Sequence, residues 1–403
     1  MNIDHRRIAA IRKGVARVLV RPIFGALFYR RLRRDTREIQ PPKRILLMNG
    51  AHIGDIIIAT SVLPILRSAY PDAEIGFVVG SWAEMVVGNH PEVAHTHVVD
   101  HWRLNRGGVS LLGKVLQFRR TRRVALKEIR QIKYDVAISI YPRFFPDFLD
   151  LSCEANIPVR IGFKENLFSN LATALVDVPE SPFVHMGSVL AEPLHALGID
   201  PTHFRFRKSS LAPSDPVSIR EVCSVFQVPN LVGLTYRVIH MGTAAIQREL
   251  PLSFWREVAE KLSREHVLLF TGRGAHEYDN ICKVTEGLSH CFNACDRLTW
   301  RGFVAAVQCA EVLYGVESMA GHVAGAVGTR CIVVYAGVGG VAQWRPEGKD
   351  SVAFTNHLPC APCRLPLGQC YLQQGSLRNG QQTHGTALPC TQGINPLDLV
   401  RLG

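Results

Sequence analysis

The 403-residue chain lacks several features that would place it in other classes of protein. It has no run of 18 apolar residues, so we expect no transmembrane helix. Basic residues interrupt the early apolar stretches, which argues against a secretory signal peptide; they are Arg12, Lys13, Arg17 and Arg21. We therefore expect a cytoplasmic protein whose 11 cysteines are thiols or metal ligands rather than disulfides.

Aromatic residues are also scarce, at 8% of the chain, and they do not interleave with the basic residues. Proteins that bind single-stranded nucleic acid combine the two, so we expect no nucleic acid partner. Acidic residues are rare in two segments that are rich in Lys and Arg. As a result, residues 1–44 carry a net charge of +10 and residues 101–133 carry +9. We therefore expect the N-terminal half to meet an anionic partner, such as a phospholipid or a phosphorylated glycolipid.

Residues 6–22 have the periodicity of an amphipathic helix, with apolar side chains on one face and basic side chains on another. A further basic run follows at 30–34. This pattern favours an anionic membrane surface as partner. The alternative is a helix that docks on its own domain and leaves a solvated basic face.

Short apolar segments alternate with helical segments along the chain, which is typical of doubly wound parallel sheets. In the first half we predict strands at 45–48, 74–79, 96–99 and 134–139, and helices at 56–69 and 110–131. After a linker at 205–216 we predict strands at 231–240, 267–271, 312–315 and 330–335, and helices at 253–263 and 319–327. The predicted parts are a basic amphipathic segment (1–40), two α/β domains (41–212 and 213–358), and a cysteine-rich tail with a C-terminal helix (359–403).

A tight turn follows the first predicted strand, with the sequence NGAHIGD from Asn49 to Asp55. Asp55 opens a long apolar segment, so the pattern predicts strand, loop and helix, with Asp55 at or beside the helix N-cap. Such a junction presents a carboxylate and backbone N–H groups at the mouth of an α/β cleft. The alternative is that Asp55 only caps the helix. The turn lacks the G-x-G-x-x-G spacing of dinucleotide-binding oxidoreductases.

A second informative segment is YGVESMAGHVAGAVGTRCIVVY, from Tyr314 to Tyr335. A strand delivers Glu317 to a loop, and a helix of small residues begins near Gly321. Small residues let a ligand approach the helix N-terminus, which favours an anion such as a pyrophosphate. The alternative is a glycine-rich helix packed closely on its sheet.

A third segment carries four cysteines with the spacing C-x2-C-x6-C-x19-C, namely Cys360, Cys363, Cys370 and Cys390. The pattern predicts a four-thiolate site for structural zinc or iron, because tetrahedral sulfur coordination suits both metals. The alternative is a set of reduced cysteines without metal.

Together these segments resemble glycosyltransferase family 9, the lipopolysaccharide heptosyltransferases. The first half contains the family's Gly-Asp pair and the positions that follow it, here Gly54-Asp55, Pro64, Leu66 and Pro71-Asp72-Ala73. The second half contains a small-residue loop and a basic residue before a proline, here His240-Met241-Gly242-Thr243, Arg248 and Pro251. The family's Asp-(Ser/Thr)-Gly-x-x-His appears as Glu317-Ser318-Met319-Ala320-Gly321-His322.

The resemblance implies the GT-B fold, with two Rossmann-like doubly wound domains facing a cleft and the C-terminal helix packed across the first domain. It implies that Asp55 is the general base of an inverting transfer from an ADP-heptose-like donor to a lipid-linked glycan such as lipopolysaccharide inner core. The residues that match the donor site are Thr243, Arg248, Glu317, Ser318, Gly321 and His322. For the acceptor we expect contacts with His52, Gly54 and two residues of the second basic segment, Arg119 and Arg120.

Three residues depart from the family pattern: Arg248 replaces a lysine, Glu317 an aspartate and Met319 a glycine. The alternatives are therefore a member that uses another donor sugar or a protein or small-molecule acceptor, or a non-catalytic nucleotide- or metal-binding protein. The chemistry requires no cofactor in this interpretation. An anionic glycolipid acceptor and an anionic membrane surface place the protein in the cytoplasm, on the inner face of the inner membrane.

Overall fold

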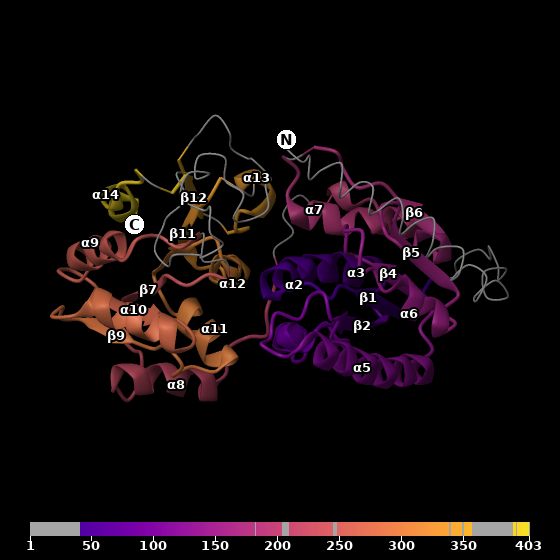
Figure 1. Cartoon of the computed structure of the whole chain (residues 1–403), viewed down its shortest axis with the longest axis horizontal. Coiled ribbons are helices and arrows are strands. Elements are labelled where there is room, and N and C mark those ends of the chain that lie inside the picture. The colour runs from indigo at the N-terminus through magenta and orange to yellow at the C-terminus, as the bar shows by residue number, and fades with distance from the viewer. Residues whose placement is uncertain are drawn as a thin grey trace. The chain divides into compact units, whose positions relative to one another are not determined.

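The computed structural model describes residues 41–181, 183–203, 209–244, 248–337, 340–348, 350–356, 390–391 and 393–402. The chain divides into two compact units between Arg207 and Lys208, called unit 1 and unit 2 below (Figure 1). The predicted amphipathic helix at 6–22 and three of the four tail cysteines (Cys360, Cys363 and Cys370) lie outside the described residues.

Unit 1 is built on a six-stranded sheet with the strand order β3-β2-β1-β4-β5-β6. All five strand pairings are parallel, and this order is that of the Rossmann fold. The strands are β1 (Arg44–Met48), β2 (Glu74–Val79), β3 (His95–Val98), β4 (Val136–Ser139), β5 (Val159–Phe163) and β6 (Ala174–Val176).

Helices cover both faces of the unit 1 sheet (Figure 1). They are α2 (Ile53–Ala59), α3 (Leu63–Ala69), α4 (Glu84–Val87), α5 (Leu111–Ile132), α6 (Leu149–Glu154) and α7 (Met186–Ala191), with short 3-10 turns η1 (Thr60–Val62), η2 (Ser81–Ala83), η3 (Ser169–Leu171), η4 (Glu192–Leu197) and η5 (Pro201–His203). Leu46 and Met48 of β1 join one core with buried residues of α5 and α6. Because side chains alternate along a strand, Ile45 and Leu47 are buried on the opposite face.

Unit 2 repeats this topology, with the strand order β12-β11-β10-β7-β8-β9 and only parallel pairings. Its strands are β7 (Tyr236–His240), β8 (Val267–Thr271), β9 (Cys291–Asn293), β10 (Val312–Val316), β11 (Arg330–Tyr335) and β12 (Val352–Thr355). Its helices are α8 (Pro216–Phe226), α9 (Leu252–Leu262), α10 (Ala275–Thr285), α11 (Trp300–Gln308), α12 (Met319–Val327), α13 (Val341–Trp344) and α14 (Pro396–Arg401). The predicted fold class, two Rossmann-like doubly wound parallel sheets, is confirmed.

The C-terminal helix α14 packs within unit 2, which corrects the expectation that it would pack across the first domain. Leu399 is fully buried and joins the core formed by α9 and α10 on the unit 2 sheet. The guanidinium of Arg330 also donates a hydrogen bond to the carbonyl of Leu402. A buried leucine and this hydrogen bond therefore anchor the helix to its own sheet.

A membrane-spanning helix would need about 20 apolar residues. Among the described residues, no helix is both long enough and apolar enough to cross a membrane.

Candidate functional site

Each unit has a switch point at the carboxyl edge of its sheet, where neighbouring strands lead their chains in opposite directions. In unit 1 the neighbours are β1, which continues to β2, and β4, which continues to β5. In unit 2 they are β7 and β10. Open α/β sheets bind ligands in the crevice at such points, because the loops diverge there.

The loops that follow β1 and β4 are tied together by one buried asparagine. The side chain of Asn49 donates from Nδ2 to the carbonyl of Ile140 (3.2 Å) and accepts from the backbone N–H of Ala51 (3.0 Å). Gly50, in the loop after β1, lets Phe148 of the segment after β4 approach closely, because a Cβ at position 50 would lie 2.7 Å from the ring of Phe148. The close approach of these two loops explains the first glycine of the turn.

Asp55 lies in the first turn of α2, where it is the third helical residue rather than the N-cap. The N-cap is His52, whose backbone N–H donates to Asp55 Oδ2 at 3.3 Å. The prediction that Asp55 lies at or beside the N-cap is thus correct in part. His52 is the N-cap, and Asp55 lies three residues after it, where its carboxylate accepts from the N-cap backbone. Asp55 remains partly accessible, so it can also contact a ligand.

The electrostatics of Asp55 are set by desolvation and by two arginines. Burial raises the pKa of the Asp55 carboxyl, whereas Arg143, the backbone N–H of His52 and Arg106 lower it. Burial also lowers the pKa of His52 to about 4, with Arg106 and Arg143 adding to the effect, so this imidazole is neutral at neutral pH. The edge therefore combines a carboxylate with a raised pKa, a neutral imidazole and at least two cations.

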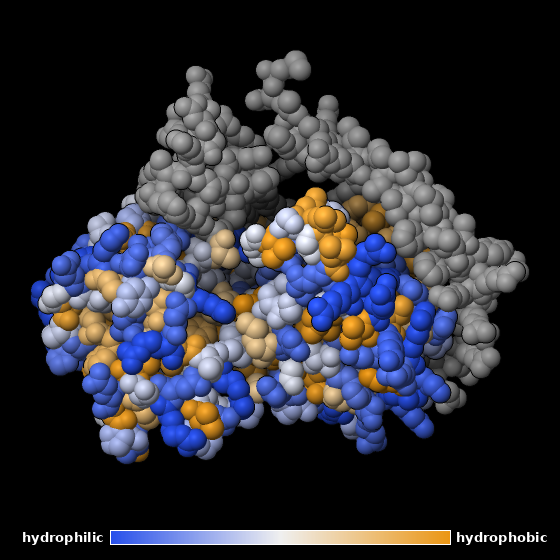
Figure 2. Space-filling model, turned by 60° about the horizontal axis from the view of Figure 1, so that its bottom comes forward, coloured by the Kyte–Doolittle hydropathy of each residue, from blue (hydrophilic) through white to orange (hydrophobic). Residues whose placement is uncertain are grey.

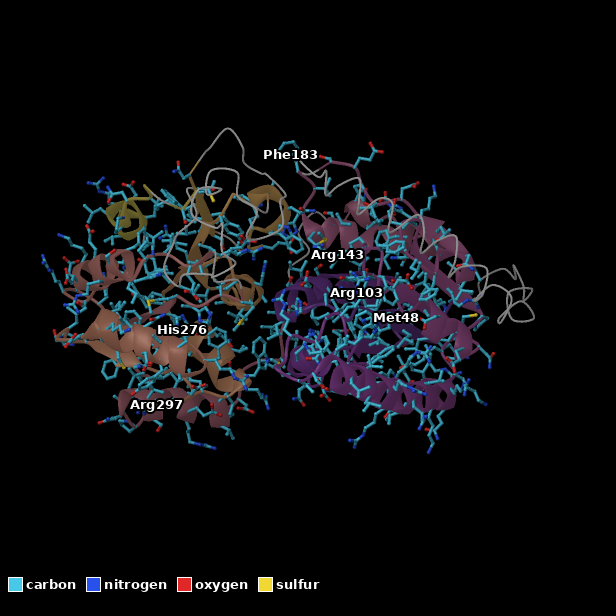
Figure 3. The ribbon with its side chains drawn as sticks, in the orientation of Figure 1. Met48, Arg103, Arg143, Phe183, His276 and Arg297 are labelled. Carbon is cyan, nitrogen blue, oxygen red and sulfur yellow. The ribbon has the colours of Figure 1, made fainter. Side chains whose placement is uncertain are left out.

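A third arginine, Arg103, also acts at this edge. Burial raises the pKa of Tyr141, and the charges of Arg143 and Arg103 oppose that rise. Figure 3 labels both arginines together with Met48, the last residue of β1. Arg143 was missed in the sequence analysis, although it follows the predicted strand at 134–139. The carboxyl ends of parallel strands share one edge, and this rule could have found it.

The predicted acceptor residues are only partly brought together. Gly54 and His52 adjoin Asp55 in the loop and first turn of α2. Arg119 and Arg120 lie at exposed positions of α5, and the cations that act on Asp55 are Arg143 and Arg106. An acceptor role for Arg119 and Arg120 stays a prediction.

In unit 2, the switch point holds an ion pair between a buried glutamate and a partly exposed arginine. Glu317 follows β10, is 8% exposed, and its Oε1 lies 3.1 Å from Nη1 of Arg248. Burial raises the pKa of Glu317 to about 7, although Arg248 lowers it. The hydroxyl of Thr243, in the loop after β7, donates to the carbonyl of Glu317 at 3.1 Å. The predicted residues Thr243, Arg248 and Glu317 therefore form one cluster.

Three polar atoms of this cluster are buried without a hydrogen-bond partner among the described residues: Oε2 of Glu317, Nε of Arg248 and Oγ of Ser318. Ser318 is the N-cap of α12, but its side chain makes no capping hydrogen bond. Buried polar groups are almost always satisfied in native proteins, and each exception calls for an explanation. A ligand at the N-terminus of α12 would supply the missing partners.

Gly321 and His322 lie in the first turns of α12. A Cβ at Gly321 would lie 3.0 Å from Val333 of β11 and 3.1 Å from Pro346. The glycine thus allows close packing of α12 against the sheet, which is the structural alternative raised for this helix. His322 is partly exposed near the N-terminus of the helix.

A small pocket lies beside the loop that follows β7. Its lining includes Gly242, Glu249, Trp255 and Glu277. Burial raises the pKa of Glu277, and the backbone N–H of Arg273 donates to its Oε2 at 2.9 Å. The indole N–H of Trp255 is buried without a partner among the described residues. Local sequence pattern does not reveal this pocket, because Trp255 and Glu277 belong to different helices, α9 and α10.

No group of three or more potential metal ligands is assembled among the described residues. Of the four predicted cysteine ligands, only Cys390 is described, and its side chain is buried. The metal site therefore stays a prediction.

Comparisons with known proteins agree with one another. The family model of glycosyltransferase family 9 (heptosyltransferase) matches residues 122–368. Lipopolysaccharide heptosyltransferase 1 of Pseudomonas aeruginosa is 21% identical over 330 residues, which are 79% of this chain and 86% of that protein.

Among solved structures, E. coli ADP-heptose lipopolysaccharide heptosyltransferase II has a TM-score of 0.65 at 15% identity, covering 89% of this chain and 97% of its own. The iron-containing dodecameric glycosyltransferase TibC of enterotoxigenic E. coli has a TM-score of 0.51 at 12% identity, covering 91% and 77%. At these identities the structures show a shared fold. The family match spans more than half of the chain, and the protein therefore belongs to glycosyltransferase family 9, the heptosyltransferase family, and is a glycosyltransferase.

Proposed function

We propose that this protein transfers a heptose-like sugar from an ADP-sugar, with inversion, to a hydroxyl of a lipid-linked glycan such as lipopolysaccharide inner core. The observation that carries the proposal is Asp55 at the unit 1 switch point, a carboxylate with a raised pKa among cations. Family membership supports glycosyl transfer, and the resemblance to the heptosyltransferases supports the proposed donor and the inversion.

Asp55 is suited to act as the general base. In its ionised form it takes the proton of the acceptor hydroxyl while that oxygen attacks the anomeric carbon of the donor. The new glycosidic bond forms as the bond from the anomeric carbon to the diphosphate oxygen breaks, and the diphosphate leaves with the bonding electrons. A raised pKa makes the carboxylate a stronger base, whereas Arg143 and Arg106 keep the ionised form accessible.

The same arginines suit an anionic acceptor. Arg106 and Arg143 act on the Asp55 carboxylate and Arg103 acts on Tyr141, and guanidinium pairs well with phosphate and carboxylate groups. His52 is neutral beside them and can hydrogen-bond a sugar hydroxyl without adding charge. An acidic sugar or a phosphorylated glycolipid therefore fits this edge better than a neutral glycan.

For the donor diphosphate we propose the cluster at the N-terminus of α12. Arg248 supplies positive charge, Thr243 a hydroxyl, and Ser318 a buried polar oxygen without a partner among the described residues. Backbone N–H groups at a helix N-terminus add a favourable field for an anion. These groups stabilise charge on the leaving diphosphate, which is chemistry that needs no metal ion.

For the nucleoside we propose the adjoining pocket lined by Gly242, Glu249, Trp255 and Glu277. Glu249 and Glu277 offer oxygen acceptors to hydroxyl and amino groups, and the Trp255 indole offers a buried donor. E. coli heptosyltransferase II, which shares this fold, is named for ADP-heptose, and this supports an ADP-sugar as the donor.

The test is product formation from a panel of nucleotide-sugars on truncated lipopolysaccharide acceptors, read by mass spectrometry. We expect a heptose increment with the ADP-sugar and an inverted anomeric configuration by NMR. Transfer of a different sugar would favour the second candidate, a member with another donor, which the replacements at Arg248, Glu317 and Met319 motivate. No transfer together with intact nucleotide binding would favour the non-catalytic alternative.

We further propose a structural zinc or iron ion on Cys360, Cys363, Cys370 and Cys390. The buried side chain of Cys390 and the C-x2-C pair suit a closed tetrahedral site, and TibC is described as iron-containing. When bound, the metal would order the tail rather than take part in transfer. Elemental analysis of protein never exposed to chelator should find about one equivalent of metal. Near-absence of both metals would exclude the site, and Cys363→Ser should lower the metal content.

For the location of the enzyme, we propose the cytoplasmic face of the inner membrane, where a lipid-linked acceptor is presented. The amphipathic segment at 1–40 is one candidate for attachment, and it lies outside the described residues.

A further inference from the structure

Helix α5 of unit 1 exposes large apolar side chains in its first two turns. Leu111, Leu112 and Leu116 are 64%, 69% and 56% exposed, and Val109 just before the helix is 53% exposed. Single exposed apolar residues are ordinary on protein surfaces, but a contiguous group marks an interaction site. We call this group, together with the exposed cations described next, the α5 surface.

The cations of the α5 surface continue the same side of the helix. Arg119, Arg120, Arg123 and Lys127 are exposed, and they follow Leu112 and Leu116 at intervals of three and four residues. Such intervals place side chains on one helical face. Among the described residues, none of these four cations has an ion-pair partner, whereas Arg122 pairs internally with Asp150 (2.9 Å) and Glu154 (2.7 Å).

The α5 surface has no acidic residue of its own helix to balance it. The one acidic residue of α5 is Glu128, and its Oε2 lies 2.9 Å from Nδ1 of the buried His97. Solvated helix faces ordinarily mix both signs of charge, so a face with only cations and leucines points to a partner. Helix α5 lies along the bottom of Figure 1, and Figure 2 turns that side toward the viewer. On unit 1 in this view, a hydrophobic area adjoins a hydrophilic one.

We propose that the α5 surface docks unit 1 onto an anionic phospholipid membrane. The leucines enter the apolar boundary of the bilayer, and the arginines and lysine meet the phosphate groups, as on interfacial amphipathic helices. The apolar side chains are aliphatic, which suits lipid better than the aromatic stacking that single-stranded nucleic acids require. The assigned partner is thus a bilayer surface with a net negative charge.

The placement of the α5 surface also has a consequence that rests on the proposed function. Val109 is three residues from Arg106, which acts on the electrostatics of Asp55. A membrane bound along α5 would therefore lie next to the unit 1 switch point. A lipid-linked acceptor could then reach Asp55 without leaving the bilayer.

The experiment is sedimentation of the full chain with vesicles of phosphatidylcholine alone and of phosphatidylcholine mixed with phosphatidylglycerol. We expect binding only to the anionic vesicles, weakening as salt rises. The double variant Arg123→Glu/Lys127→Glu should bind at least roughly thirtyfold more weakly, because each lost basic residue near an anionic surface contributes about fivefold and the new glutamates add repulsion. Leu112→Ser/Leu116→Ser should lose about tenfold per leucine.

Matched controls come from exposed residues of unit 2. Val217 and Val232 are 56% and 90% exposed, and Arg264 and Lys283 are exposed cations. Val217→Ser/Val232→Ser and Arg264→Glu/Lys283→Glu should therefore bind the vesicles as the unchanged protein does. Circular dichroism should show that all four variants keep their helix content.

Several outcomes would overturn the proposal. Equal binding of the α5 variants and the unchanged protein would place the attachment elsewhere in the chain. Equal binding to both vesicle types would exclude an anionic partner, and binding to single-stranded RNA without vesicle binding would favour nucleic acid. None of these measurements involves sugar transfer, so a failure here is distinct from a failure of the proposed function.

Discussion

The two units share one topology but surround their switch points with different chemistry. In unit 1 the edge holds a partly accessible carboxylate, Asp55, whose charge is balanced by Arg143 and Arg106. In unit 2 the edge holds the pair of partly exposed Arg248 and buried Glu317, with polar atoms that lack partners among the described residues. The same strand order therefore supports a carboxylate among cations at one edge and, at the other, an ion pair with polar atoms that lack partners among the described residues.

The difference shows which part of a site a fold supplies. The parallel sheet places loops at one edge in both units, and function depends on the side chains that those loops carry. Burial raises the pKa of both Asp55 and Glu317, but Asp55 is the less covered residue of the two and has no paired arginine at ion-pair distance among the described residues. Glu317 is better placed to hold a ligand than to move a proton.

The largest expected effect comes from Asp55→Asn. The amide oxygen can still accept from the N–H of His52, so the fold should persist while kcat falls about 10²- to 10⁴-fold. In the unchanged enzyme, transfer should be lost as the pH falls through the raised pKa of Asp55, because the base must be ionised. Steady-state kinetics measures the loss of turnover at Asp55, and calorimetry should show that ADP still binds as it does to the unchanged enzyme.

The matched control for this change is Asp177→Asn, since the Asp177 side chain is 72% exposed and far from the switch point in sequence. It should leave kcat unchanged. Turnover of Asp55→Asn at the level of this control would remove Asp55 from the chemistry.

A smaller effect is expected from Arg248→Ala, which should weaken ADP binding roughly 10- to 100-fold, as for loss of a charged hydrogen bond. Acceptor binding should not change, because Arg248 belongs to unit 2. Isothermal calorimetry measures both affinities, with the exposed Arg264→Ala as control. Unchanged ADP affinity would place the diphosphate away from the Arg248–Glu317 pair.

Glu317→Gln tests whether burial raises the pKa of Glu317, through the pH dependence of the free energy of unfolding. The pKa of Glu317 is raised from 4.5 to about 7, so the folded state binds its proton more tightly than the unfolded state does. This contribution is fully present below the unfolded pKa and is lost as the pH rises through about 7. The unchanged protein should therefore lose about 2–3 kcal/mol across this window relative to Glu317→Gln.

Urea unfolding of both proteins between pH 4 and 8 measures this difference. The Glu311→Gln change is a suitable control, because the Glu311 side chain is 46% exposed. A pH-independent difference between Glu317→Gln and the unchanged protein would mean that Glu317 titrates normally.

The smallest expected effect is that of Gly321→Ala. A Cβ would approach Val333 and Pro346 at 3.0 and 3.1 Å, so the variant should lose about 1–2 kcal/mol of stability through overpacking. If the glycine serves packing, ADP affinity should change little once the protein is folded. A large loss of ADP affinity at unchanged thermal stability would instead restore the donor-binding role.

Several elements could be predicted to the residue because local pattern and tertiary environment agree. The strands β2, β8 and β11 and the helix α12 are such cases. The predicted helix at 56–69 is instead two helices joined by a 3-10 turn, and Pro64, which lacks a backbone N–H, lies just after the turn. The predicted strand at 231–240 began too early, because Gly233 has a positive φ of 76° and belongs to a turn.

Other elements could not be found from local pattern. In β5 a buried arginine, Arg160, interrupts the apolar run, and its guanidinium donates to the carbonyls of Leu171 and Ile157. The carbonyl of Leu171 is far along the chain, and that of Ile157 lies outside regular secondary structure. Sequence periodicity therefore does not predict these hydrogen bonds. The edge strands β6 and β9 are three residues long and partly exposed, which leaves almost no apolar signal.

The sequence by itself determined the family, the two alternating α/β halves and the residues at both switch points that follow a predicted strand. These properties follow from apolar periodicity and from short motifs, which are local in the chain. Only the tertiary structure decided that Arg143 and Arg106 act on Asp55, that Glu317 is buried beside Arg248, and that α14 joins unit 2. The reason is physical, since desolvation and charge depend on distances between segments that are far apart in the sequence.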